Sequence, residues 1–362
     1  GAIFNTTGAV TAAQPRNGAW IGNLHCFAAG AFAFSTTFFR SSAANVESRI
    51  GRIDGTVRAV ATGDVVLDMD NGDIEVGHAA FPNDGIVRGA FQLAVVTAGT
   101  TRILGGEVEG GIGVLLQSLA GAGNLTVQNF RVTGVGAIGG GIYTALNCTG
   151  SILFENCFLA GNSDTLKLHF DGGDGTGRAV LRRTRVEATG AAAAVDSLDC
   201  VLTLQNSEIV NLTAGQDALL VPTPTGALTS VLIWEGWNVL QVPAGAGFGL
   251  SVAAAAAGTT IQLIERGILN FGSTALADQH QIAVAVGTLT LTNQYGDAVV
   301  ASGSGTIPAG GGYCFGAAAA GVPSIHPGLH FCSGFSISTT GTAAADSFAA
   351  ANMTFANVTT GN

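Results

Sequence analysis

Short alternations of apolar and polar residues recur along this chain of 362 residues, and they predict β-strands rather than helices. The clearest pattern has two apolar residues two positions apart. An Asn or Arg follows two positions later, and another apolar residue three positions after that. Four copies start at Leu125, Ile152, Ala179 and Leu202, so the steps between them are 27, 27 and 23 residues. A repeat of this length predicts a solenoid, in which each turn of the chain stacks on the turn before it.

Weaker copies extend the pattern in both directions. They bring the expected total to nine turns, with steps of 23 to 34 residues, and they start at Leu67, Thr101, Leu232, Ile261 and Leu289. The longest step contains His78 to Arg88, which we expect to be an inserted loop. Because residues two positions apart lie on one face of a strand, each turn should direct its apolar residues into a shared core. Strands of successive turns should then pair in parallel, about 4.8 Å apart.

The bend at the fifth position of each copy is most often asparagine. Asparagine tolerates a left-handed backbone, and its amide group can donate and accept hydrogen bonds along a stack of identical neighbours. The repeat therefore predicts an asparagine ladder, formed by Asn71, Asn129, Asn156, Asn206 and Asn293. Other residues at the same position should interrupt the ladder, namely Gly105, Arg183, Gly236 and Glu265.

This arrangement resembles the right-handed parallel β-helix of the pectate-lyase-like superfamily, over about residues 60–300. The expected fold class is therefore all-β, a solenoid of about nine turns with non-repeating ends. We expect residues 61–300 to form the β-helix. Residues 1–60 would either cap the rod or dock onto another protein, and residues 301–362 would form a C-terminal cap or an oligomerisation region.

Composition narrows the classes of partner. Charged residues make up 10% of the chain, and 14 basic against 24 acidic residues give a net charge of −10. Nucleic-acid backbones are bound by clustered Lys and Arg, so that class of partner is disfavoured. The longest apolar run, Ala28 to Phe34, is too short to span a membrane. We expect no cofactor.

The six cysteines contain no CxxC pair, which disfavours a zinc site, and we expect no metal. Cys148, Cys157 and Cys200 fall inside the repeat, where we expect buried free thiols. Cys314 and Cys332 flank a segment rich in Gly and Pro, and they are the candidate pair for a disulfide.

Candidate catalytic residues gather in one turn, between Asn162 and Arg178. They are the only lysine, one histidine and three aspartates: Asp164, Lys167, His169, Asp171 and Asp174. On a strand, Lys167, His169 and Asp171 share one face. In β-helix lyases and hydrolases such a face supplies acid and base groups, and the resemblance implies this as one interpretation. The interpretation that we favour is a solvated strand face followed by a Gly-Asp turn, because the family's catalytic motifs are not recognisable here.

Two further groups are candidates for binding. Arg182 and Arg185 should point outward, where Glu155 and Glu208 on other turns would pair with them, and glycan or phosphate recognition is the alternative. Trp234 and Trp237 stand three apart around a bend, so at least one should face solvent. An exposed indole there would stack on a sugar ring or fill a subunit interface.

Three classes of function fit this sequence. The one that we favour is a structural or receptor-binding appendage of a virus particle, similar to the β-helical tail spikes, fibres and head decorations of bacteriophages. It implies a location on the virion or outside the cell and contacts with other virion proteins through residues 1–60. It also implies a homo-oligomer, by resemblance a trimer, and a host glycan as receptor. The alternatives are a secreted polysaccharide lyase or hydrolase, and a bacterial surface adhesin or filament subunit.

Overall fold

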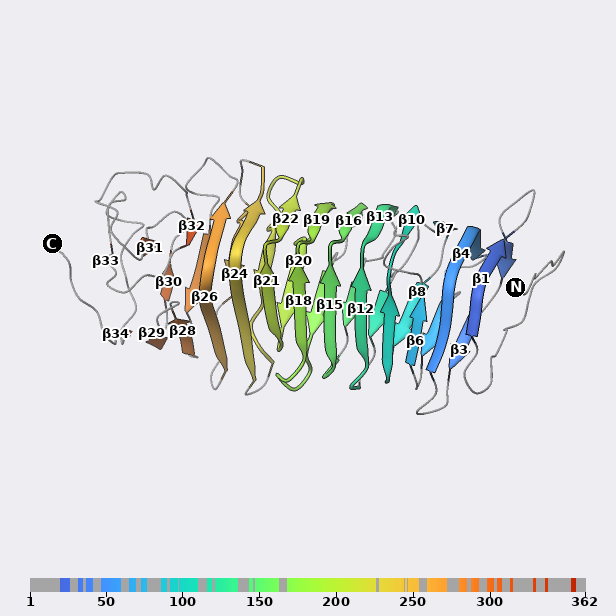
Figure 1. The fold of residues 1–362 in the computed structure, drawn as a ribbon. Coiled ribbons are helices and arrows are strands. Elements are labelled where there is room, and N and C mark those ends of the chain that lie inside the picture. The colour runs from blue at the N-terminus through green and yellow to red at the C-terminus, as the bar shows by residue number, and fades with distance from the viewer. Residues whose placement is uncertain are drawn as a thin grey trace.

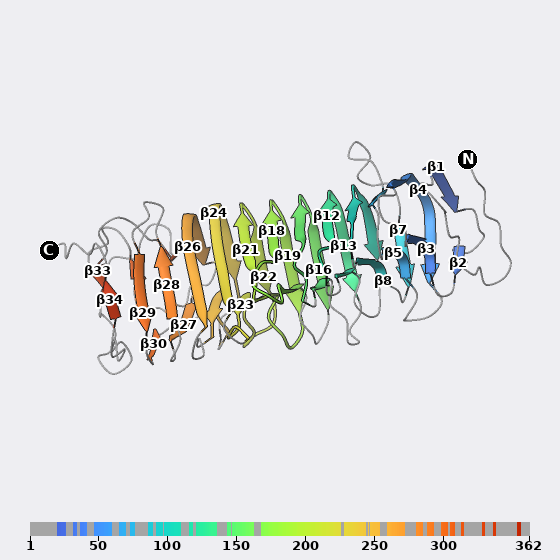
Figure 2. The same ribbon diagram turned by 90° about the horizontal axis from the view of Figure 1, so that it is seen from below.

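The computed structural model is a parallel β-solenoid, an all-β rod in which successive turns of the chain stack on one another (Figure 1). Figures 1 and 2 show the strands following one another along the rod, with the N-terminal strands at one end and the C-terminal strands at the other. The predicted fold class is confirmed. The structure describes residues 98–109, 121–135, 147–162, 168–225, 228–243, 245, 247–253 and 259–271, together with the strands outside these ranges. Within these residues there is no helix, and hence none long and apolar enough to cross a membrane.

The turns supply strands to two large sheets. An 11-stranded sheet is built from short strands of successive segments of the chain. Its strands are β3 (Thr37–Ser41), β5 (Val65–Met69), β8 (Gln92–Val96), β11 (Leu116–Ser118), β14 (Tyr143–Ala145), β17 (Leu168–Asp171), β20 (Val195–Leu198), β23 (Leu219–Val221), β25 (Leu250–Val252), β27 (His280–Val284) and β30 (Gly305–Ile307).

A 21-stranded sheet takes the strands before and after each bend. Its first strands are β1 (Trp20–Cys26), β2 (Phe32–Phe34), β4 (Glu47–Ala59), β6 (Asp73–Val76), β7 (Ile86–Gly89), β9 (Thr100–Ile103) and β10 (Gly106–Glu109). Its central strands are β12 (Asn124–Gln128), β13 (Phe130–Val135), β15 (Ser151–Glu155), β16 (Phe158–Asn162), β18 (Arg178–Arg182), β19 (Arg185–Thr189), β21 (Val201–Gln205), β22 (Glu208–Asn211), β24 (Thr229–Gln241) and β26 (Thr260–Phe271). Its last strands are β28 (Thr288–Thr292), β29 (Ala298–Ser302), β32 (Gly328–Leu329) and β34 (Met353–Phe355), while β31 (Tyr313–Cys314) and β33 (Ser336–Ile337) pair separately.

Side chains alternate between core and surface along the central strands, as the apolar pattern predicts. In β15, Ile152 and Phe154 are buried, whereas Leu153 and Glu155 lie half-buried on the outside. Phe154 meets Phe170 of the opposite sheet edge to face, with ring centroids 6.5 Å apart. Each fully buried side chain of this size contributes about 1.5–3 kcal/mol. The core is therefore built from the positions that alternate with the outward ones.

The register of the four strong copies is the predicted one. Leu125 pairs with Ile152, Ile152 with Ala179, and Ala179 with Leu202, all in parallel strands. The next strand continues the series, because Leu202 pairs with Leu232. The stack has about five turns rather than the nine predicted. The count of nine is therefore wrong, although the class of fold holds.

Three of the weaker copies are out of register with the strong copies. Leu67 lies on β5, in the 11-stranded sheet, whereas the strand that pairs with β9 is β6. Leu263, not Ile261, is the partner of Leu232, and Leu263 pairs in turn with Leu291. Sequence periodicity cannot separate the two possible registers of β26, because a shift of two residues keeps the same side chains inward.

The predicted inserted loop is corrected in part, because Ile86–Gly89 is strand β7, which pairs in parallel with β4 and β10. The proposed divisions at residues 60 and 300 stay predictions. On the N-terminal side, β1 pairs in parallel with β4, and β4 with β6. On the C-terminal side, β29 runs antiparallel to β28, and β30 runs antiparallel to β27.

Candidate functional site

One outer surface of the rod carries most of the polar contacts between turns. We call it the ladder face, and it is the outside of β12, β15, β18, β21 and the first halves of β24 and β26. Its strands pair in parallel without a register shift. The last outward residue before the bend is polar or charged in all six turns. These residues form a row along the rod: Gln128, Glu155, Arg182, Gln205, Glu235 and Arg266.

Four hydrogen bonds and one ion pair join each member of this polar row to the next. Gln128 Nε2 donates to Glu155 Oε2 at 2.7 Å, and Arg182 Nη1 lies 3.6 Å from Glu155 Oε1. Arg182 Nε donates to Gln205 Oε1, and Gln205 Nε2 donates to Glu235 Oε2, both at 2.6 Å. Arg266 Nη1 completes the row with a bond of 3.0 Å to Glu235 Oε1.

The two carboxylates of the row are held in their charged form. Burial raises the pKa of Glu155, but hydrogen bonds from Gln128 and Arg183 and the charges of both neighbouring arginines lower it overall. The Arg266 hydrogen bond is the largest influence on Glu235, and with the bond from Gln205 it outweighs burial and lowers the pKa. A carboxylate that accepts bonds from two sides is stabilised by both.

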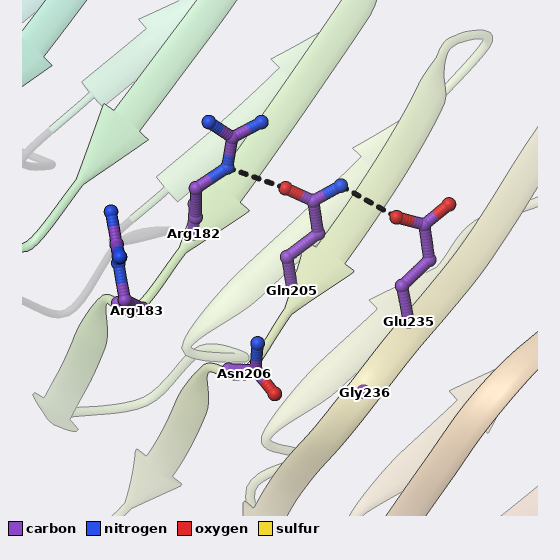
Figure 3. Close-up of a pocket in the computed structure, with 6 residues that line it drawn as sticks. All are labelled: Arg182, Arg183, Gln205, Asn206, Glu235 and Gly236. Carbon is purple, nitrogen blue, oxygen red and sulfur yellow. Dashed lines mark hydrogen bonds between the residues drawn. The ribbon is translucent and has the colours of Figure 1, made fainter.

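A pocket of about 190 Å³ opens at the centre of the ladder face. It is lined by Arg182, Arg183, Gln205, Asn206, Glu235 and Gly236. Figure 3 shows that these residues come from three successive turns, with the side chains of Arg182, Gln205 and Glu235 in one line. Gly236 has a positive φ of 70°, and a Cβ there would collide with the side-chain oxygen of Asn206. The absence of that side chain keeps the pocket open on one side.

The bend beside the polar row has a left-handed backbone in four consecutive turns. The φ angles are 51° at Asn129, 53° at Asn156, 48° at Arg183 and 52° at Asn206. Asn156 Nδ2 donates to Asn129 Oδ1 at 3.3 Å, and the N–H of Trp237 donates to Asn206 Oδ1 at 2.9 Å. Asn71 and Asn293 of the predicted ladder lie outside the described residues. The corrected register places Gly267, rather than Glu265, beside Gly236.

A second, buried row that the sequence pattern did not reveal follows the bend. Its first three members stand one position after the bend residue, and Asn238 stands two positions after Gly236, because β24 carries one extra residue there. Its members are Cys157, Thr184, Ser207 and Asn238. The N–H of Cys157 donates to Thr184 Oγ1, that of Thr184 to Ser207 Oγ, and that of Ser207 to Asn238 Oδ1, at 3.4, 3.2 and 2.9 Å. Small polar residues at this position in successive copies are the signal that would have identified it.

The structure describes three of the five candidate catalytic residues: His169, Asp171 and Asp174. His169 and Asp171 are half-buried on the outside of β17, and Leu168 and Phe170 are buried, which is the predicted alternation. Asp171 Oδ1 accepts the N–H of Gly173, and Asp174 Oδ1 accepts the N–H of Thr176, both at 2.9 Å. These two aspartates stabilise the turn between β17 and β18. Asp164 and Lys167 lie outside the described residues.

His169 has a partner that the sequence did not suggest. Its Nδ1 lies 3.5 Å from Oδ1 of Asp196, the residue directly beside it on β20. Burial lowers the pKa of His169, but the close contact with Asp196 and the charges of Asp196 and Asp171 raise it overall. Asp196 is itself buried, so a charged imidazole is the natural partner for its carboxylate. The pair links two turns of the 11-stranded sheet.

The candidate binding residues differ in their exposure and in their contacts. Trp234 is fully buried and belongs to the core, so it is excluded as a contact for a ligand, whereas Trp237 is 41% exposed. Arg182 lies 3.6 Å from Glu155, and Arg185 Nη1 is 2.6 Å from Glu208 Oε2. The ion pairs between turns that the sequence predicts are therefore present.

The cysteines within the described turns are buried free thiols, as predicted: Cys148, Cys157 and Cys200. Burial is the main influence that raises the pKa of Cys157 to about 11 and that of Cys200 to about 12. Cys332 lies outside the described residues, so the pairing with Cys314 stays a prediction. Among the described residues, no three His, Cys, Asp or Glu side chains come together in a way that could hold a metal ion.

An aliphatic row runs beside the polar row on the ladder face. Its members occupy the second position of each copy and are all half-buried: Thr126, Leu153, Val180, Thr203, Ile233 and Ile264. Val201 and Val231 extend the apolar surface on the side away from the polar row. The ladder face thus combines an apolar surface with a row of charges that are paired within the chain.

Fold and surface together define this chain as a parallel β-solenoid whose turns are tied together by rows of side chains. Searches with the sequence and the structure against family models, curated proteins and solved structures found no match.

Proposed function

We propose that this protein is a structural rod of an extracellular appendage, with the receptor-binding appendage of a virus particle as its setting. The polar row of the ladder face carries this proposal. Its hydrogen bonds and the ion pair between Arg182 and Glu155 run along the axis of the rod from Gln128 to Arg266, so these polar groups hold neighbouring turns together. Such a surface suits a component that must keep its length and shape under load.

The contacts that the candidate catalytic residues make support the same proposal. Asp171 and Asp174 accept hydrogen bonds from the backbone of a turn, and His169 is paired with Asp196. A lyase or hydrolase needs acid and base groups that converge on a substrate. The described candidates instead bind the backbone of their own loop, or, in the case of His169, a carboxylate of the neighbouring turn of the rod.

We propose Trp237 as the receptor contact, because its indole is the most exposed aromatic side chain among the described residues and stands at a bend of the rod. Exposed indoles stack on sugar rings. We expect immobilised host glycans to retain the protein and the variant Trp237→Ala to lose that retention. Leu212→Ala is a matched control, because Leu212 is an exposed apolar residue (51%) at a different bend. Equal retention of the two variants would remove Trp237 from the binding surface.

Immunogold electron microscopy tests the setting. Antibodies against the purified chain should label projecting appendages of virus particles from the source culture. Label on bacterial envelopes alone would support the adhesin instead. Depolymerisation of an acidic polysaccharide by the purified chain, followed as absorbance of unsaturated products, would support the enzyme and overturn the structural proposal.

A further inference from the structure

The order of residues along the ladder face has an internal symmetry. From the turn of β15 to the turn of β26, the polar row reads Glu155, Arg182, Gln205, Glu235, Arg266. Read in reverse, every Glu falls on an Arg and every Arg on a Glu, while Gln205 falls on itself. The row is therefore complementary in charge to its own reversed copy.

The aliphatic row is also symmetric about its middle residue, which lies on β21. Over the same five turns it reads Leu153, Val180, Thr203, Ile233, Ile264. On reversal Leu153 meets Ile264, Val180 meets Ile233, and Thr203 meets itself. Two independent rows thus share one point of symmetry, on strand β21.

We propose that the ladder faces of two copies of this chain pack together about a two-fold axis that runs along β21, with the two rods antiparallel. Such an axis reverses the order of turns and keeps each row opposite itself, which is the isologous contact of a symmetric dimer. Glu155 then faces Arg266 of the second copy, and Arg182 faces Glu235 of the second copy. Complementary charges of this kind fix the register of an interface, whereas like charges oppose the wrong one.

Two residues that line the pocket also lie symmetrically about the proposed two-fold axis. Arg183 and Gly236 lie one turn on either side of β21, so the exposed guanidinium of Arg183 would lie over the position where Gly236 has no side chain. That guanidinium would also approach Glu235 of the second copy. The alternative two-fold axis, parallel to the rod, would place the polar row opposite the row of Ser151, Arg178 and Val201. It would bring Arg178 against Arg182, so like charges would oppose this arrangement.

The area of the ladder face sets how tightly the two copies should bind each other. Five turns at about 4.8 Å, and four rows of outward and bend residues, cover on the order of 500 Å² per copy. The total of about 1,000 Å² is near the lower limit for a specific interface. The dimer should therefore be reversible and depend on protein concentration.

Sedimentation velocity of the full chain over a range of concentrations tests the proposal, with a monomer–dimer equilibrium as the expected result. Thr203→Lys places two ammonium groups together at the axis and should raise the dissociation constant by about tenfold or more. Thr126→Lys is the matched control, because Thr126 is a half-buried threonine of the same row, outside the five turns, and should leave the constant unchanged. Circular dichroism verifies that both variants fold. A monomer at every concentration, a trimer, or equal effects of the two substitutions would overturn the proposal.

Crosslinking tests the axis itself. A bis-maleimide with a spacer of about 10 Å matches the distance between packed sheets. Thr203→Cys should crosslink to itself above the background of the unmodified protein. Val180→Cys and Ile233→Cys should crosslink when mixed and remain at background alone. Crosslinking of Val180→Cys to itself as strong as that of the mixture would contradict an antiparallel two-fold pairing.

Discussion

The side-chain oxygen of Asn238 accepts a hydrogen bond from the backbone N–H of Ser207 at 2.9 Å, deep in the wall of the rod. The contact is the last step of the buried row that links four turns. At each bend the chain turns away from its strand, and a backbone N–H needs a partner that the next strand does not offer. A short polar side chain from the following turn supplies that partner.

Thr184 is the best position at which to test this row. Its hydroxyl accepts the N–H of Cys157 at 3.4 Å and lies 3.1 Å from the carbonyl oxygen of Phe154, to which it donates. Thr184→Val keeps the shape but leaves these buried groups unpaired, so it should lower the free energy of unfolding by about 1–3 kcal/mol. Urea denaturation followed by circular dichroism measures the change. Thr203→Val, on the outer surface of the next turn, should change stability by about 0.5 kcal/mol or less.

The left-handed bend predicts different changes in stability for substitutions at two neighbouring turns. Asn156 adopts this backbone readily and Arg183 does not, although their φ angles are 53° and 48°. Asn156→Ala should therefore destabilise the protein by about 1 kcal/mol. Arg183→Gly should cost less than that, or increase stability, even though it removes a pairing with Glu155 at 2.5 Å. Thermal melting of the two variants checks the order, and a larger loss for Arg183→Gly would show that its ion pair outweighs backbone strain.

The His169–Asp196 pair predicts that stability falls as the pH rises. The pKa of His169 is raised above its ordinary value of 6.5 in the folded chain. Its contribution is therefore complete below about pH 6.5 and is lost as the pH rises through the folded pKa. Urea denaturation at about pH 6 and about pH 8 should show the loss in the unmodified protein and a smaller difference in His169→Gln. The imidazole resonance of His169, followed by NMR, should titrate above pH 6.5. A normal or lowered midpoint would contradict the pairing.

The polar row predicts a separate loss of stability in acid. The pKa of Glu155 is lowered from 4.5, so its contribution is present above about pH 4.5 and lost as the pH falls through the folded pKa. Glu155→Gln removes that titration, and its stability should change less between about pH 6 and about pH 3.5 than that of the unmodified protein. Denaturation curves at the two pH values measure the difference. A matched acid response of the two proteins would show that Glu155 contributes little to the row.

The fold was predictable because the four strong copies each place apolar residues at the same inward positions, from Leu125 to Leu202. Register was predictable only where copies carry the full pattern. In β26, Ile261 and Leu263 are both buried, so either residue satisfies the inward alternation, and only hydrogen bonding to β24 selects the second.

The candidate site was harder to predict, because it depends on which turns become neighbours. Arg182 and Glu155 were placed in matching outward positions, and the structure pairs them. His169 gave no sign of Asp196, since the loop between their strands hides the register of β17 with β20. The buried residues Thr184 and Ser207 recur one position after the bend, which is visible in the sequence, but what they bind depends on which turns become neighbours.

The reversal of strand direction near the C-terminal end has a consequence for assembly in the long direction. A further copy can extend a parallel stack only where the last strand still offers its edge in the same direction. At this end β29 already occupies the edge of β28 in the opposite direction, and β30 does the same at β27. Stacking of copies in parallel register therefore stops here. Contacts between copies at this end therefore cannot use the edges of β27 and β28 in parallel register.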